Sequence, residues 1–264
     1  MSQVVEQYYD AVCEDEWNRL VRHRLEFDMT KALLQSRLPA KGAVLDVGGG
    51  PGRYSMWLAS LGYQVTLVDL SAQNVRRAQE EAEKSAVTLR AVHGNALALD
   101  ELQLGQFDAV LCMGPLYHLL EEAQRNLAVE HCLARLRPDG VFAAAFISAY
   151  APMIDALKKY PHMIDTEEQN YRAWMQDGRG YAGSGSFTDA YFIRPEEARS
   201  FMESFGLREG TLYATECLGA TAEANLAALT EDQFARWVSL LASFAAEPAV
   251  LGSCEHLLYI GCKD

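Results

Sequence analysis

The chain alternates short apolar runs with longer segments in which apolar residues recur every three or four positions. Short apolar runs bounded by turn residues predict buried strands, whereas the 3.6-residue period predicts amphipathic helices. Their alternation favours a parallel sheet that is covered by helices on both faces. The predicted strands are 43–47, 64–69, 88–94, 107–114, 141–148, 208–217 and 255–263.

The segments between these strands carry signals typical of helix ends. Ser71 is placed to cap the helix after the second strand, and Pro195 lies near the first turn of a later helix. The last two strands are not joined by the usual simple crossover, so we expect one of them to run antiparallel at the edge. The predicted helices are 53–62, 72–86, 121–136, 194–206 and 230–248.

Two parts of the chain fall outside this alternation. Before the first strand, one amphipathic helix carries Val4, Tyr8 and Val12 on a single face, and a second helix spans roughly 30–38. Residues 149–190 are rich in Tyr, Met, Gly and Asp and contain the loop GRGYAGSGS. We expect a single domain, 1–264, made of an N-terminal helical cap (1–38), a core (40–148), an inserted cap (149–193) and the C-terminal part of the sheet (194–264).

The composition narrows the class of protein. The 264 residues are 50% hydrophobic and 22% charged, which is ordinary for a globular chain, and the formal net charge is −13. Nucleic-acid binding requires a basic surface to neutralise phosphates, so this charge disfavours a nucleic-acid substrate. The N-terminus lacks the apolar core of a signal peptide, and the most apolar stretch, 141–154, is too short and interrupted to span a bilayer. These features predict a cytoplasmic protein without membrane attachment.

The six cysteines do not form a recognisable metal or redox motif. There is no Cys-x-x-Cys pair, and no Cys/His group has the spacing of zinc ligands. Most of them lie among apolar residues, which favours buried thiols in a reducing compartment. We therefore expect a protein that uses no metal.

The stretch VLDVGGGPGRYS (44–55) places four glycines within five positions directly after the first predicted strand. A strand, a glycine-rich turn and a helix form the nucleotide-binding opening of many α/β folds, because the helix start offers free amides. A P-loop would need Lys and Ser or Thr after Gly52, but Arg53 and Tyr54 follow. The dinucleotide pattern counted from Gly48 would need a glycine at position 53, where Arg53 stands.

The order Asp46-x-Gly48-x-Gly50-x-Gly52 resembles the first motif of the class I S-adenosylmethionine-dependent methyltransferases. Four further stretches match that family in order, over 40–148 and more loosely to 264: VTLVDLS, HGNALAL, FDAVLCMGPLYHL with LRPDGVFAAAF, and EPAVLGSCEHLLYIGCK. The resemblance implies a Rossmann-like, seven-stranded and mostly parallel sheet in the order 3-2-1-4-5-7-6. Its last strand is antiparallel, and helices cover both faces.

The resemblance also implies S-adenosyl-L-methionine as the cofactor. Asp69 would accept both ribose hydroxyls, because a carboxylate offers two oxygens. Asn95 stands where the family often has an acid, so its amide oxygen would meet the adenine amine without a charge. The Met113 carbonyl would meet the cofactor's amino group. The predicted cofactor-binding residues are Gly48, Gly49, Gly50, Asp69, Leu70, Asn95, Ala96 and Met113.

Methyl transfer requires alignment of the nucleophile more than covalent help, because the cofactor carries the reactive group. A base assists a hydroxyl or ammonium nucleophile, and His118, just past the fourth strand, is the candidate catalytic residue. The alternative is a structural histidine or one that touches the cofactor. The Gly178–Gly185 loop is a candidate lid. The predicted substrate-binding residues are Tyr8, Tyr9, Tyr117, Tyr150 and Tyr181, although such aromatic residues are also typical of ordinary core.

The predicted function is in-line methyl transfer from S-adenosylmethionine to an O, N, S or C atom of a small molecule, by a monomer or homodimer. One alternative is a nicotinamide-dependent oxidoreductase on a similar sheet, which Arg53 and the absence of a Tyr-x-x-x-Lys set oppose. A second is a non-catalytic cofactor-binding protein, against which Gly48, Gly50 and Asp69 argue. A macromolecular substrate is a further alternative, and at this charge a protein fits better than RNA.

Overall fold

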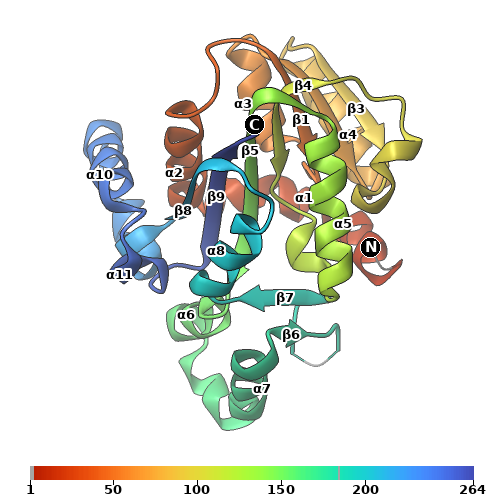
Figure 1. The fold of residues 1–264 in the computed structure, drawn as a ribbon. Coiled ribbons are helices and arrows are strands. Elements are labelled where there is room, and N and C mark those ends of the chain that lie inside the picture. The colour runs from red at the N-terminus through yellow and green to blue at the C-terminus, as the bar shows by residue number, and fades with distance from the viewer. Residues whose placement is uncertain (1–2, 184) are drawn as a thin grey trace.

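The computed structural model describes residues 3–183 and 185–264, and its centre is one twisted sheet (Figure 1). The main strands coincide with the seven predicted apolar runs to within a few residues, except that the fifth begins earlier. They are β1 (Ala43–Val47), β2 (Gln64–Asp69), β3 (Leu89–His93), β4 (Phe107–Cys112), β5 (Leu136–Ser148), β8 (Arg208–Ala214) and β9 (His256–Cys262).

The seven main strands lie side by side in the order β3-β2-β1-β4-β5-β9-β8. Numbered along the chain, this is the predicted order 3-2-1-4-5-7-6, which is confirmed. Strand β9 runs antiparallel to both β5 and β8, whereas the other neighbours are parallel, so the predicted antiparallel strand is confirmed as well. The carboxyl ends of β1, β2, β4 and β5 therefore meet at one edge of the sheet.

Two short strands that the sequence pattern did not predict extend the sheet at this edge. Strand β7 (Ala190–Ile193) pairs in parallel with the last residues of β5, and β6 (Arg179–Gly180) pairs antiparallel with β7. The pairing of β7 uses Ile147 and Ser148, which extend beyond the end of β4. The inserted cap is thus attached to the carboxyl edge of the sheet by backbone hydrogen bonds.

Helices cover the sheet much as predicted. Ser71 caps the helix after β2, because its Oγ accepts from the amide of Asn74, and Pro195 opens the helix before β8. The predicted helix 121–136 ends at Ala134, since Leu136 already pairs with Phe107 in the sheet. The covering helices are α3 (Arg53–Ser60), α4 (Ala72–Lys84), α5 (Glu122–Ala134), α8 (Pro195–Glu203) and α10 (Glu231–Phe244), with short α9 (Glu223–Leu226) and α11 (Pro248–Leu251).

The two N-terminal helices are α1 (Gln3–Arg22) and α2 (Arg24–Gln35). The predicted start of the second helix was wrong by six residues, because Leu25, Met29 and Leu33 are buried at helical spacing against the core. Helix α1 kinks at Val12. Its Asp10 accepts hydrogen bonds from the Ser71 hydroxyl (2.5 Å) and the Gln73 amide (3.2 Å), so α1 lies across the start of α4.

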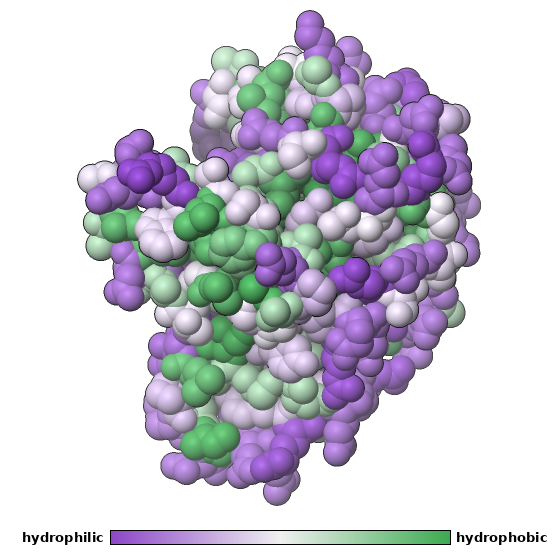
Figure 2. Space-filling model, turned by 60° about the vertical axis from the view of Figure 1, so that its left-hand side comes forward, coloured by the Kyte–Doolittle hydropathy of each residue, from purple (hydrophilic) through white to green (hydrophobic). Residues whose placement is uncertain are grey.

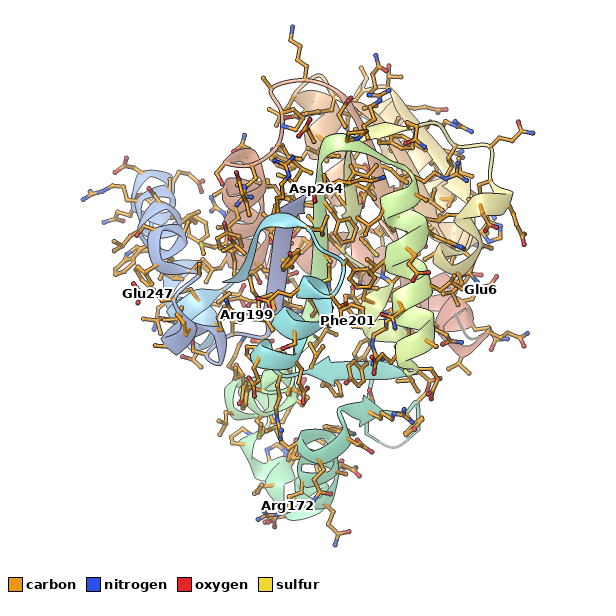
Figure 3. The ribbon with its side chains drawn as sticks, viewed as in Figure 1. Glu6, Arg172, Arg199, Phe201, Glu247 and Asp264 are labelled. Atoms are coloured by element: carbon orange, nitrogen blue, oxygen red, sulfur yellow. The ribbon has the colours of Figure 1, made fainter. Side chains whose placement is uncertain are left out.

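Residues of the inserted cap form a lobe below the carboxyl edge of the sheet, made chiefly of α6 (Ala151–Lys159) and α7 (Ile164–Asp177) (Figure 1). Trp174 anchors it by packing against Ile147 and Phe192. Leu157, Tyr160 and Ile164 are each more than half exposed, and Figure 2 shows hydrophobic side chains on the lobe surface. Figure 3 places Arg172 at its outer end.

The remaining expectations concern thiols and membranes. Cys112, Cys132, Cys217 and Cys254 are buried, as predicted, whereas Cys13 and Cys262 are partly exposed. Within residues 3–183 and 185–264, the structure contains no helix that is long and apolar enough to cross a membrane.

Candidate active site

The glycine loop turns sharply between β1 and α3 and passes close to the end of β4. Gly48 has a φ of +70°, and a Cβ at this position would lie 2.5 Å from the Cδ of Pro115. Both the backbone angle and the close approach therefore require glycine. The Gly48 amide donates to the Val68 carbonyl (2.7 Å), which ties the loop to the end of β2.

Asp69 holds the glycine loop and the start of α4 together. Its Oδ2 accepts from the Gly50 amide (2.8 Å), and its Oδ1 accepts from the Ser71 amide (2.9 Å) and the Asn74 side chain (3.2 Å). Burial raises the pKa of Asp69, and the hydrogen bonds oppose that rise. Oδ2 accepts only one of these bonds and so retains a lone pair for a further donor, such as a ligand hydroxyl.

A cavity of about 50 Å³ opens over these residues, and we call it the loop cavity. The sheet edge supplies one wall and helix α1 supplies the other. It is lined by Gly48, Gly50, Asp69, Leu70, Ser71, Asn74, Gly114, Pro115, Tyr117 and His118, and from α1 by Val5, Glu6, Tyr9 and Glu16.

A second cavity of about 50 Å³ adjoins the glycine loop, and Gly49 and Met113 line it. Asp46 also lines it, with Oδ2 accepting from the Ser55 hydroxyl (2.7 Å). The other oxygen, Oδ1, is buried and has no hydrogen-bond partner among residues 3–183 and 185–264. Burial raises the pKa of Asp46 to about 6. A buried acceptor without a partner is rare, so this oxygen is suited to receive a ligand donor such as an ammonium group.

Asn95 and Ala96 lie apart from these two cavities. The Asn95 Oδ1 accepts from the Leu97 amide (3.0 Å) and so caps the short helical turn Ala96–Glu101, whose first residue is buried. Of the eight predicted cofactor-binding residues, the structure gathers six around the glycine loop. The adenine contact of Asn95 and Ala96 stays a prediction.

His118 lies in the turn Leu116–His118 after β4, where it is buried between two hydrogen-bond partners. Its Nδ1 lies 2.9 Å from the carbonyl oxygen of Asp189, which can only accept, so Nδ1 carries the proton. Its Nε2 then accepts from the Tyr9 hydroxyl at 2.8 Å. Burial lowers the pKa of His118 to about 4. The imidazole is therefore neutral near pH 7, and its lone pair is already engaged.

A much larger cavity, of about 540 Å³, lies between α1, the lobe and the 185–187 loop, and we call it the aromatic cavity. Three predicted substrate-binding residues, Tyr8, Tyr9 and Tyr117, line it. Tyr150 instead lies against Gly252, just after α11, and Tyr181 is about half exposed beside Arg179. The aromatic lining residues are Tyr8, Tyr9, Tyr117, Tyr160, Tyr171, Trp174, Phe187 and Phe192.

The three cavities meet at a few side chains. Glu16 and Tyr117 line all three of them, and Tyr9 lines both the loop cavity and the aromatic cavity. A ligand in the loop cavity can therefore approach a ligand in the aromatic cavity at this junction, which we define as Tyr9, Glu16 and Tyr117.

An ion-pair network forms part of the wall of the aromatic cavity. Arg19 donates to both oxygens of Glu26 (2.7 and 3.1 Å) and, through Nε, to Glu16 (3.0 Å). His256 donates from Nδ1 to Glu216 (2.6 Å). Burial by itself lowers the pKa of His256, but the carboxylates of Glu26 and Glu216 raise it to about 9, so this histidine is protonated at neutral pH.

Glu26, Glu216 and His256 have donor atoms within 4.8 Å of one another, which is close enough for a metal site. However, Arg19 occupies both oxygens of Glu26, and Glu216 accepts from the amides of Glu255 and His256 as well as from the imidazole. A metal ion would have to displace these donors. The arrangement fits an ion-pair network better than a metal centre.

Sequence reasoning missed Glu16, Arg19 and His256. Glu16 and Arg19 lie on the polar side of an amphipathic helix, where charged residues are ordinarily solvent-exposed. His256 lies at the start of a strand more than 200 residues away. Only the packing of α1 against the carboxyl edge brings them together, so no local motif marks them.

Comparisons with known proteins identify the family of this chain. The methyltransferase domain family matches residues 44–140. A ubiquinone biosynthesis O-methyltransferase from Xanthomonas axonopodis pv. citri is 36% identical over 183 residues, which cover 66% of this chain and 68% of that protein. A glycine/sarcosine N-methyltransferase from Halorhodospira halochloris is 24% identical over 226 residues, covering 79% and 81%.

Among solved structures, magnesium protoporphyrin IX methyltransferase from Synechocystis PCC 6803 with bound SAH has a TM-score of 0.57 over 99% of both chains. Its sequence identity is 15%, so this likeness concerns the fold alone. The sequence relatives carry the assignment further, and the glycine loop, Asp69 and the strand order of this chain are consistent with it. The chain belongs to the class I S-adenosylmethionine-dependent methyltransferases.

Proposed function

We propose that this enzyme methylates a small-molecule acceptor that binds in the aromatic cavity. The observation that carries the proposal is the junction, because Glu16 and Tyr117 border the glycine loop on one side and the aromatic cavity on the other. The relatives named for glycine/sarcosine and for ubiquinone biosynthesis support an acceptor of metabolite size. Since S-adenosylmethionine is the cofactor, the nicotinamide alternative no longer applies.

The residues around the glycine loop fit this cofactor. Asp69 retains a lone pair on Oδ2 for a ribose hydroxyl, and the unpartnered Asp46 Oδ1 would accept from the ammonium group of the methionine part, in a cavity that Met113 also lines. Gly48 leaves room for close backbone contact. When bound, the cofactor supplies an activated methyl group on its sulfonium, and the chain has to orient the acceptor in line with it and exclude water.

Tyr9 and His118 are proposed to work as a pair. Because His118 is neutral and accepts from the Tyr9 hydroxyl, it fixes that hydroxyl at the junction. His118 then acts as a positioning residue for Tyr9 and not as the predicted general base. The carbonyl of Asp189 completes the arrangement, so the 181–189 loop is coupled to the junction.

We further propose that the N-terminal cap, core, inserted cap and C-terminal part act as one domain, since α1 and the lobe both complete the cavities. Phe187, just after the predicted Gly178–Gly185 lid, contacts the ring of Tyr8 edge-on, with centroids 5.8 Å apart, which supports a lid role for the described part of that loop, residue 184 lying outside the described residues. The protein is proposed to work without a metal, as a monomer or homodimer that sedimentation equilibrium can distinguish.

The donor half of this proposal is tested by calorimetry with S-adenosylhomocysteine. We expect one site per chain, no binding of NAD, and a Kd raised about 10-fold or more by Asp69→Ala, because charge-assisted hydrogen bonds are lost. Asp100→Ala, at an exposed carboxylate away from the loop cavity, is the matched control. Unchanged affinity of Asp69→Ala would contradict the assigned role, and absence of transfer from labelled cofactor to any metabolite would favour a non-catalytic protein.

A further inference from the structure

The walls of the aromatic cavity have a chemistry that distinguishes acceptor classes. Eight aromatic side chains line it, from α1, η2 (Leu116–His118), the lobe, the 185–187 loop and β7. Aromatic faces attract cations as well as apolar groups, and a set of several rings is the usual way to bind an ammonium ion. The cavity therefore suits either a neutral aromatic molecule or an amine. The charges of the side chains around the cavity distinguish between these two classes.

The basic side chains of the cavity wall already have carboxylate partners. Within residues 3–183 and 185–264, each such side chain has an acidic partner, so none is left to neutralise an anionic acceptor. The pairs are Arg19 with Glu16 and Glu26, Arg22 with Asp15, Lys159 with Asp155, His23 with Glu223, and His256 with Glu216.

The same network has more carboxylates than cations. Arg19 pairs with Glu16 and Glu26, and the protonated His256 pairs with Glu216 and lies 3.8 Å from Glu26. These three carboxylates and two cations together carry one net negative charge. An incoming cation would balance this charge, whereas an incoming carboxylate would add to it.

The junction offers hydrogen-bond acceptors to the reacting group. The Tyr9 proton is directed to His118 Nε2, so the hydroxyl oxygen of Tyr9 faces the junction as an acceptor. Glu16 uses Oε1 for Arg19, and its Oε2 has no hydrogen-bond partner in the described part of the chain. Two acceptors on a shared wall match a nitrogen that carries several N–H groups.

We propose that the methyl acceptor is a primary or secondary amine with an aromatic or apolar body, bound as its ammonium ion with the nitrogen between Glu16 and Tyr9. This inference rests on the proposed function. The ammonium gives one N–H proton to the Glu16 carboxylate, and the freed lone pair forms the N–C bond. The S–C bond breaks with its electron pair on sulfur, which leaves a methylammonium product and a thioether, and Glu16 returns its proton to solvent.

The first experiment compares three probes of one shape and different charge: 2-phenylethylamine, 2-phenylethanol and 3-phenylpropionate. Each is titrated into the enzyme saturated with S-adenosylhomocysteine and is then assayed with labelled S-adenosylmethionine. We expect the amine to bind at least 10-fold more tightly than the other two and to be the methylated probe. Equal or better binding or methylation of the alcohol or the carboxylate overturns the proposal, and so does failure of all three to bind.

A pair of variants locates the amine at the junction. Glu16→Gln should raise the Kd of 2-phenylethylamine about 10- to 100-fold, because a charge-assisted hydrogen bond becomes a neutral one. Glu14→Gln is the control, since Glu14 lies on the same helix and pairs with Arg77 outside the cavity. Binding of S-adenosylhomocysteine should stay unchanged in Glu14→Gln, and in Glu16→Gln it should change much less than binding of the amine, because Glu16 also borders the loop cavity. An unaltered amine Kd in Glu16→Gln contradicts the inference. If the unmodified enzyme does not bind S-adenosylhomocysteine at all, the proposed function itself is contradicted.

Discussion

At the scale of single residues, the pairing of Tyr9 with His118 changes the interpretation of the histidine. The pattern of the sequence presents His118 as a free imidazole just past a strand, which is typical of a general base. The structure gives both ring nitrogens a partner, and burial lowers its pKa to about 4. A group that stays neutral above pH 5 cannot produce an acid limb in the rate near neutral pH.

We therefore predict that Tyr9→Phe and His118→Ala have strongly non-additive effects. Each should lower kcat/KM about 10-fold or more, and the double variant should lose little beyond the more damaging single change, because both remove one shared interaction. The His118→Ala profile of kcat against pH should keep the shape of the wild type between pH 5.5 and pH 8. Additive losses, or disappearance of a titration near pH 6.5, would instead support the general base.

The residues that could be predicted from sequence are those whose roles are local. Gly48 and Asp69 belong to a turn and a strand end that contact each other through the Gly48 amide on the Val68 carbonyl and the Gly50 amide on the Asp69 carboxylate, so their spacing already encodes their contact. Glu16 and His256 owe their position to packing between the two ends of the chain. Tyr150 was placed by its residue type, but the turn after β5 directs its ring towards α11.

At the scale of elements, the ion-pair network joins α1 and α2 to the start of β9. Arg19 of α1, Glu26 of α2 and His256 of β9 contact one another directly or through one carboxylate. The pKa of His256 is raised from about 6.5 to about 9, so the folded state binds this proton more tightly than the unfolded state. Its stabilising effect is complete below pH 6.5 and is lost as the pH rises to 9.

The expected result is a fall in the free energy of unfolding of about 2–3 kcal/mol between pH 6 and pH 9 from this one group. His256→Gln should be less stable than the wild type at pH 6 and should show a shallower fall towards pH 9. Urea denaturation at several pH values measures both, with the exposed His162→Gln as control. If His256→Gln retains the full wild-type slope, the network does not depend on a protonated histidine.

The elements themselves were largely predictable, because buried parallel strands are apolar throughout and amphipathic helices have a clear period. The exceptions have physical causes. The first turn of α2 is masked by Arg24, Glu26 and Asp28, whose charges are satisfied by ion pairs and do not mark a loop. Strands β6 and β7 are two and four residues long, which is too short for an alternating pattern to stand out.

At the scale of the whole molecule, the sheet supports the glycine loop, whereas the two opposite walls of the aromatic cavity come from segments outside the sheet. Helix α1 closes both cavities from one side, and the lobe with its 181–189 loop closes the aromatic cavity from the other (Figure 1). The cofactor-binding core can therefore be common to many enzymes, whereas acceptor choice depends on the N-terminal and inserted segments.

Helix α1 also imposes a sequence on ligand entry. The loop cavity and its neighbour are about 50 Å³ each, below the several hundred cubic ångströms that ligand pockets usually occupy, so we predict that α1 moves outward to admit S-adenosylmethionine. We expect α1 to bend at the kink at Val12. In the closed position, Asp10 holds the helix by accepting hydrogen bonds from Ser71 and Gln73. The same movement would take Tyr9 away from the aromatic cavity, so we expect the acceptor site to be complete only while α1 is closed.

We therefore predict a compulsory order, with the donor binding first and the acceptor second, and with the methylated product leaving before S-adenosylhomocysteine. We expect S-adenosylhomocysteine to inhibit competitively against S-adenosylmethionine and noncompetitively against the amine, and amine binding to be undetectable by calorimetry until a donor analogue is present. Asp10→Ala removes the hydrogen bonds from Ser71 and Gln73 that hold α1 closed. It should relax this order and raise the KM for the donor. Equal amine affinity with and without S-adenosylhomocysteine would show that the two ligands enter independently.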